Sequence, residues 1–121
     1  HTARRLLDED RVGAAVMFSL ILGADGGIRG DMRSLLHMVD ALPRGVPWSA
    51  AGVGKAARLV VPGALLMGGH ARIGFEDTQL LRSQVSASSN SELVGMAVTV
   101  AEAIGRDIAD VTEARAVLGL N

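Results

Sequence analysis

Apolar and polar positions alternate in blocks along the chain, and the blocks predict strands and helices in turn. Three apolar runs bounded by glycine or turn residues are typical of buried strands: 15–22, 48–53 and 71–76. Helical spacing of apolar positions follows over 32–42, where Asp31 is the expected N-cap. It recurs over 55–67, where Pro62 should kink or split the helix. The pattern therefore predicts units in which a strand leads into a helix.

The C-terminal part of the chain is predicted to be helical after a polar break. Residues 78–88 are polar, and we expect them to be irregular. Ser89-Asn90-Ser91-Glu92 fits a capping box that opens a helix to about Ile104. A last helix is expected over 112–118, before a glycine. With the end of a helix predicted over 3–10, the expected order is α, β, α, β, α, β, α, α.

Strands that alternate with helices at this spacing imply a parallel sheet with crossover helices, so the predicted fold class is α/β. Three strands that are apolar on both faces do not complete such a sheet, and a closed barrel of eight βα units takes ~250 residues. The chain is then either part of a larger barrel or a smaller open sheet. We predict the C-terminal part of a (β/α)8 TIM barrel, with about three βα units plus C-terminal helices. Residues 1–121 would be one fragment of a single domain.

Composition removes several classes of function. The formal net charge is −1 and the 12 Lys and Arg are scattered, so no basic face for nucleic acid is present. No apolar run approaches the roughly 20 residues of a membrane span. The chain has no Cys, which excludes disulfides and thiolate metal sites. It begins at His1 without Met or a signal-type apolar core, so we expect a fragment, a processed product or a piece of a longer protein.

The strongest candidate for chemistry is the charged end of the third predicted strand. Side chains alternate along a strand, so Arg72, Gly74 and Glu76 should share one face, while Ile73 and Phe75 pack beneath the helices on the other. Buried charges need a partner or a metal, and barrel enzymes hold their active sites at the carboxyl ends of strands. Glu76 suits a divalent cation and Asp77 a general base. The alternative is a surface Glu-Asp pair that caps the next loop, bridged by Arg72.

Two glycine-rich loops, over 23–30 and 52–55, follow predicted strands and precede predicted helices. Such loops offer backbone N–H groups to an anion, and Gly52, Gly54 and Lys55 are our candidates for holding a phosphate-bearing cofactor. An ordinary tight turn is the alternative. No two of the three histidines have metal-ligand spacing, so a complete zinc site is not expected from this chain alone.

With these residues in view, the chain resembles the C-terminal part of the β-keto acid cleavage enzymes, the family of 3-keto-5-aminohexanoate cleavage. The matching stretches occur in the expected order over nearly the whole chain. They are Leu22-Gly23-Ala24-Asp25-Gly26-Gly27-Ile28, Trp48-Ser49-Ala50-Ala51-Gly52-Val53-Gly54-Lys55, Gly68-Gly69-His70-Ala71-Arg72-Ile73-Gly74-Phe75-Glu76-Asp77, Ser89-Asn90-Ser91-Glu92-Leu93-Val94 and Thr112-Glu113-Ala114-Arg115-Ala116-Val117-Leu118-Gly119-Leu120.

The resemblance implies a (β/α)8 barrel that binds Zn²⁺ through two histidines and a glutamate. It implies a reaction in which a β-keto acid and acetyl-CoA give acetoacetate and a new CoA thioester by retro-Claisen chemistry. Glu76 would be the metal ligand, Asp77 the base that deprotonates the substrate, and Arg72 the electrostatic partner of Asp77. The family's His-x-His ligands belong to an earlier strand, so the isolated chain should be inactive. Thr78 stands where the family commonly has asparagine, and Lys55 where it has arginine.

Two other functions fit the same residues. One is a non-catalytic half-barrel or interaction module, and the other is a different barrel lyase that uses Glu76 and Asp77 with Mg²⁺. For the enzyme we expect a small-molecule substrate, no nucleic acid, no membrane, a cytoplasmic location and a homo-oligomer in the full-length form. The sequence leaves the identity of the β-keto acid open.

Overall fold

The computed structural model describes residues 5, 9 and 16–120 and contains a parallel three-stranded sheet. The strands are β1 (Phe18–Leu22), β2 (Trp48–Gly52) and β3 (His70–Ala71), in the order β1-β2-β3. Phe18 is level with Trp48, and Ser49 with His70. The parallel sheet predicted from the sequence is confirmed. The helix end expected over 3–10 lies outside the described residues, apart from positions 5 and 9.

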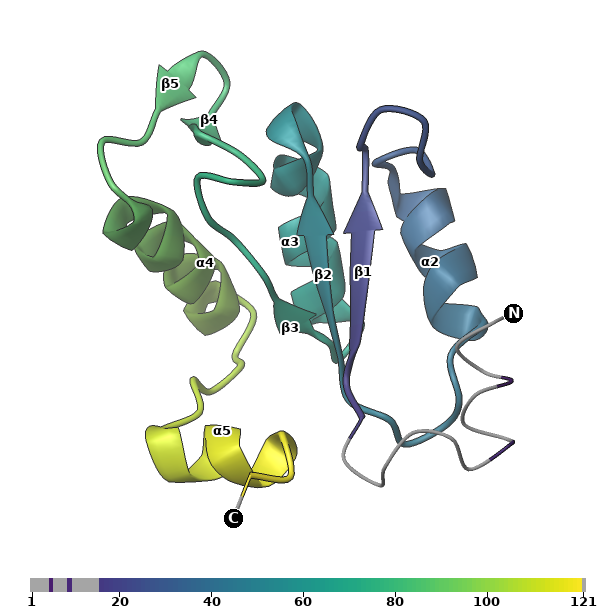
Figure 1. Ribbon diagram of the computed structural model, residues 1–121. Coiled ribbons are helices and arrows are strands. Elements are labelled where there is room, and N and C mark those ends of the chain that lie inside the picture. Colours follow the sequence, from purple (N-terminus) through teal and green to yellow (C-terminus); the bar gives the residue numbers. More distant parts are fainter. Residues whose placement is uncertain (1–4, 6–8, 10–15, 121) are drawn as a thin grey trace.

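Two helices connect the three strands as crossovers, as Figure 1 shows. Helix α2 (Met32–Asp40) begins at the predicted cap, because the Asp31 side chain accepts a hydrogen bond from the Ser34 N–H at 2.9 Å. That hydrogen bond lowers the pKa of Asp31 below its ordinary value. Helix α3 (Ala57–Leu66) follows a short 3-10 helix, η1 (Gly54–Ala56). Pro62 lies inside α3, which was expected to kink or split but continues past it as one helix.

Central strand β2 is buried along its whole length, and its small residues explain why. Leu22 of β1, Leu35 of α2 and Val60 of α3 are all 0% exposed and form one core cluster with Ala50 of β2. A Cβ at Gly52 would lie 2.5 Å from the backbone nitrogen of Ala57. Glycine at the end of β2 therefore lets the start of α3 come directly against the sheet.

The chain after β3 differs from the prediction in its first part. Residues 78–88 were expected to be irregular, but β4 (Leu80–Arg82) and β5 (Val85–Ser86) form an antiparallel hairpin. Two strands this short give no alternating pattern to recognise. Helix α4 (Asn90–Ala103) begins at the predicted Ser89, whose hydroxyl accepts the Glu92 N–H. The Glu92 carboxylate, however, accepts from the N–H of Ser88 and not of Ser89, so only the Ser89 half of the predicted capping box forms.

The last helix, α5 (Val111–Val117), starts one residue before the prediction, with a complete capping box between Asp110 and Glu113. Arg106, in the link from α4 to α5, donates hydrogen bonds to the carbonyls of Leu65 and Gly69. In Figure 1, α5 lies at the amino ends of the strands and the β4–β5 hairpin at the opposite end. Within the described part of the chain, no helix is long and apolar enough to cross a membrane.

Two glycine-to-alanine changes should have opposite effects on stability. Gly52→Ala forces a Cβ into the backbone of α3, and we expect a loss of about 2 kcal/mol in the free energy of unfolding. Gly95→Ala, in α4 where an added Cβ meets nothing within 4 Å, should raise the free energy of unfolding by about 0.5–1 kcal/mol. Urea denaturation of both variants measures the difference. Equal effects would contradict the close approach of β2 and α3.

Candidate active site

The segment after β3 does not continue as a strand, and this corrects the expectation of a strand over 71–76. The Arg72 N–H still donates to the Ala50 carbonyl of β2 at 3.0 Å, and there the ladder ends. The carbonyl of Gly74 then accepts the N–H groups of both Asp77, at 3.0 Å, and Thr78, at 2.9 Å. Residues 74–78, the active-site turn, therefore fold back on themselves.

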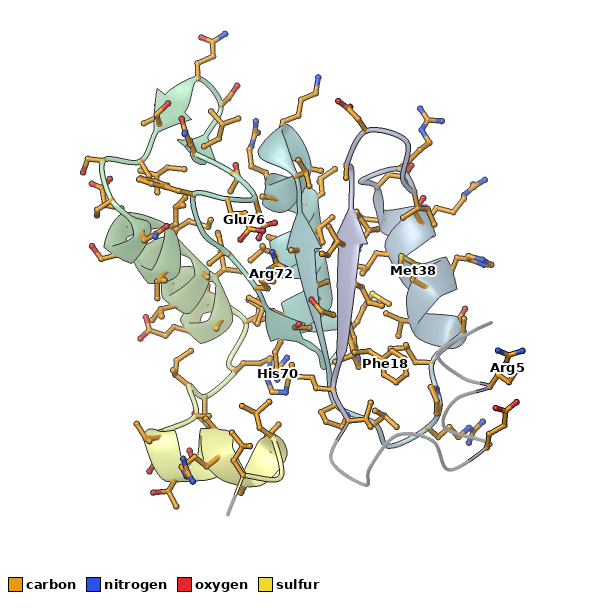
Figure 2. The ribbon with its side chains drawn as sticks, in the orientation of Figure 1. Arg5, Phe18, Met38, His70, Arg72 and Glu76 are labelled. Carbon is orange, nitrogen blue, oxygen red and sulfur yellow. The ribbon has the colours of Figure 1, made fainter. Side chains whose placement is uncertain are left out.

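The active-site turn brings together the three charged side chains that the sequence singled out. Arg72 Nε lies 3.1 Å from Asp77 Oδ2, and Arg72 Nη2 lies 3.2 Å from Asp77 Oδ1. The same Nη2 lies 3.3 Å from Glu76 Oε1. Figure 2 shows Arg72 and Glu76 pointing toward each other above β3. One guanidinium thus holds Asp77 by a two-point contact and Glu76 by a single contact.

The two neighbouring carboxylates differ in how far they are buried. The Asp77 side chain is 9% exposed, whereas the Glu76 side chain is 85% exposed. The expectation that Glu76 would share a buried strand face with Arg72 is therefore wrong, because the turn directs its carboxylate outward. Phe75, expected to pack beneath the helices, is 38% exposed, and its N–H donates to Asn90 Oδ1 at 2.8 Å. Asp77 is the carboxylate held in a protected environment.

Thr78 joins the active-site turn to the loop that follows β2, a role that sequence reasoning missed. Its side chain is almost fully buried, and its hydroxyl donates to the Gly54 carbonyl at 2.9 Å while accepting the Leu80 N–H at 3.1 Å. The Gly54 N–H in turn donates to the Asp77 carbonyl at 2.7 Å. This pair of contacts, the Gly54–Thr78 clamp, fixes the backbone of Asp77. A threonine after a Glu-Asp pair gives no local signal of such a contact.

The two glycine loops lie together and border an open space of about 910 Å³, the glycine hollow, lined by residues 23–30, 53–56, 58 and 59. A Cβ at Gly23 would lie 2.8 Å from the Cβ of Ala56, so the loops are in close contact at its base. Arg29, Lys55 and Arg58 line the hollow, together with the carboxylate of Asp25. Because the Gly54 N–H already bonds to Asp77, Lys55 supplies the charge that this loop offers to a ligand.

The described residues do not supply a complete set of metal ligands. Among the described residues, no group of three or more His, Cys, Asp or Glu side chains could hold a metal ion. Figure 2 places His70 at the amino end of β3, away from Glu76. Glu76 nevertheless fits a single ligand position, because its carboxylate is exposed and only one of its oxygens contacts Arg72.

Thr78 offers an isosteric test of the Gly54–Thr78 clamp. Thr78→Val keeps the shape but leaves the Gly54 carbonyl without its donor, and it should lower the free energy of unfolding by about 1–3 kcal/mol. Thr78→Ser keeps the hydroxyl and should lose less than half as much. Denaturant unfolding of the two variants measures the difference, and a serine variant as unstable as the valine variant would argue against the hydrogen bond.

The chain is similar to known proteins over nearly its whole length. The profile of the beta-keto acid cleavage enzyme family matches residues 1–120. A 3-keto-5-aminohexanoate cleavage enzyme from Acetoanaerobium sticklandii is 32% identical over 119 residues, which cover 98% of this chain and 44% of the relative. A relative of the same name from Fusobacterium nucleatum is 39% identical over 103 residues, which cover 85% of this chain and 37% of the relative.

A third relative, the 3-oxoadipate:acetyl-CoA acetyltransferase of Cupriavidus necator, is 34% identical over 113 residues, covering 91% of this chain and 40% of the relative. The chain spans about two fifths of the length of these three relatives. The match over nearly all of its residues shows that the chain belongs to the beta-keto acid cleavage enzyme family.

Proposed function

We propose that this chain forms part of a zinc-dependent enzyme that converts a β-keto acid and acetyl-CoA into acetoacetate and a new CoA thioester. The observation that carries the proposal is the ion pair between Arg72 and the buried Asp77, beside the exposed Glu76 and just beyond β3. Family membership and the names of the relatives, which include an acetyl-CoA acetyltransferase, support the reaction type.

Asp77 is the proposed base that takes a proton from the substrate. A carboxylate has about four lone-pair positions, and the contacts with Arg72 use one on each oxygen. Positions therefore remain for a substrate proton. Arg72 and the Gly54–Thr78 clamp hold the carboxylate and its backbone in one orientation, which a general base within hydrogen-bond reach requires. Arg72 is also the nearest cation to any negative charge that develops there.

Glu76 is the proposed metal ligand from this chain. Zinc in catalytic sites takes three protein ligands and leaves one position open, so two ligands would come from outside the described residues. When bound, zinc would polarise the keto oxygen of the substrate and stabilise the enolate that develops. Because Glu76 is exposed, its carboxylate can reach a metal ion whose other ligands come from elsewhere, while the Asp77 carboxylate stays paired with Arg72.

The proposed fold of the complete protein is a (β/α)8 barrel. Within the described residues, β3 pairs with β2 alone, and an apolar groove of about 650 Å³ runs beside it between α4 and α5. Its lining includes Ile73, Val94 and Val98. An open sheet edge beside apolar side chains is what a piece of a parallel sheet exposes when its next βα units are lacking.

We also propose acetyl-CoA as the co-substrate, held in part by the loop of Gly52, Gly54 and Lys55. Gly52 and Gly54 act through shape, since Gly52 packs against α3 and Gly54 has a φ of +55° that a side chain would strain. Lys55 is exposed and lines the glycine hollow. The glycines thus set the path of the loop, and Lys55 provides the charge.

Replacing Glu76 tests the metal assignment in the full-length protein. Glu76→Gln removes the charge of one ligand, so zinc content after dialysis should fall to well under half of the wild-type value, and acetyl-CoA-dependent acetoacetate formation should be lost. The matched control is Glu102→Gln, because Glu102 is exposed on α4. Elemental analysis and an acetoacetate assay provide the readouts. Full zinc and full activity in the Glu76→Gln variant would refute the assignment.

Replacing Asp77 separates proton transfer from metal binding. Asp77→Asn keeps the size of the side chain but removes its capacity to accept a proton, so kcat should fall about a hundredfold or more. Zinc content should stay at the wild-type level, in contrast to the Glu76 variant. Steady-state kinetics with elemental analysis distinguishes the two roles. Loss of zinc with Asp77→Asn would show that Asp77 binds the metal instead.

A further inference from the structure

The glycine hollow collects positive charge at the same end of the sheet as the active-site turn. Arg29 comes from the loop after β1, Lys55 from η1 and Arg58 from the first turn of α3. All three line the hollow, and among the described residues only one carboxylate, that of Asp25, lines it with them. Arg29 lies 4.0 Å from Asp31 with a side chain that is 91% exposed, a pairing that restrains its guanidinium little.

The glycines around the hollow bring its two loops into contact at some positions and leave free space at others. At Gly23 an added Cβ would lie 2.8 Å from the Cβ of Ala56, and at Gly30 it would overlap the same atom, so these two glycines bring the loops together. At Gly26 and Gly54 an added Cβ would meet nothing within 4 Å. Both have positive φ, which fixes the path of each loop around the hollow. The two loops are therefore in contact around Ala56 and separate elsewhere, which leaves room for a ligand between them.

The hollow is also linked to the proposed base. Gly54, which lines the hollow, donates its N–H to the Asp77 carbonyl and accepts the Thr78 hydroxyl. A molecule seated in the hollow therefore rests on the loop that positions Asp77. The ligand expected here has a strongly anionic end and a reactive end that extends toward the active-site turn.

We propose that the glycine hollow binds the phosphate groups of the CoA thioester through Arg29, Lys55 and Arg58. This inference rests on the proposed function and extends it from Lys55 to two further residues. Three cations against one carboxylate favour a ligand with several negative charges, which the diphosphate and 3′-phosphate of CoA supply. A β-keto acid with a single carboxylate does not use such a cluster. The pantetheine arm would carry the thioester from the hollow to Asp77.

The test compares acetyl-CoA with S-acetylpantetheine, which has the same thioester but lacks the nucleotide and its phosphates. In the full-length protein, Arg58→Gln should raise KM for acetyl-CoA about tenfold, or about 1.4 kcal/mol. It should leave the binding of S-acetylpantetheine unchanged, measured as substrate or as competitor. Added salt should weaken the binding of acetyl-CoA less in the variant, because one screened contact is gone. The matched control is Arg44→Gln, because Arg44 is exposed in the turn before β2 and does not line the hollow.

The outcomes separate this inference from the proposed function. An unchanged KM for acetyl-CoA in Arg58→Gln, or an equal effect on S-acetylpantetheine, overturns the phosphate site while acetoacetate formation still supports the enzyme. A wild-type protein that forms no acetoacetate from acetyl-CoA overturns the proposed function and, with it, this inference. An effect of Arg44→Gln equal to that of Arg58→Gln would show a general charge effect and also overturn the site.

Discussion

The ion pair between Arg72 and Asp77 is the contact on which the geometry of the candidate site depends. A carboxylate that is 9% exposed loses most of its hydration, and a two-point contact with a guanidinium replaces it. The backbone of Arg72 is held by the last hydrogen bond of the ladder, to the Ala50 carbonyl of β2. The sheet thus fixes the point from which the Arg72 side chain extends, and the guanidinium and Asp77 hold each other in place.

Two adjacent carboxylates receive different environments from one tight turn. The double use of the Gly74 carbonyl bends the chain so that Asp77 faces Arg72 and the loop of Gly54, while Glu76 faces outward. Differences of environment are how proteins assign different tasks to neighbouring acids. A held, protected carboxylate suits proton transfer, and an accessible one suits a metal that draws its other ligands from elsewhere. The proposed mechanism follows from this division.

The sequence predicted the parts of the fold that local pattern controls. Apolar runs bounded by glycine predicted the parallel strands, and Asp31 and Ser89 predicted the starts of α2 and α4. The predicted strand over 71–76 was wrong beyond Ala71. The alternation of Arg72, Ile73 and Gly74 is compatible with a strand, but the segment does not form one. The turn that follows is closed by the Gly74 carbonyl and is also contacted by Gly54 and Asn90, two distant residues that no local pattern reveals.

The candidate site could be found from the sequence because of its charged residues and not because of its secondary structure. Arginine and two carboxylates at the end of an apolar segment are costly unless they are paired, so their chemistry indicated a site even where the predicted geometry was wrong. Thr78 carries no comparable signal, because a buried hydroxyl is recognised only by the partners it meets in the folded chain.

The division of roles between Glu76 and Asp77 is tested most directly by a crystal structure of the full-length protein loaded with zinc. We expect a Glu76 oxygen at about 2.0–2.2 Å from the ion, with Asp77 still paired to Arg72 and outside the metal's ligands. A zinc ion bound through Asp77, or bound without Glu76, would refute this division of roles.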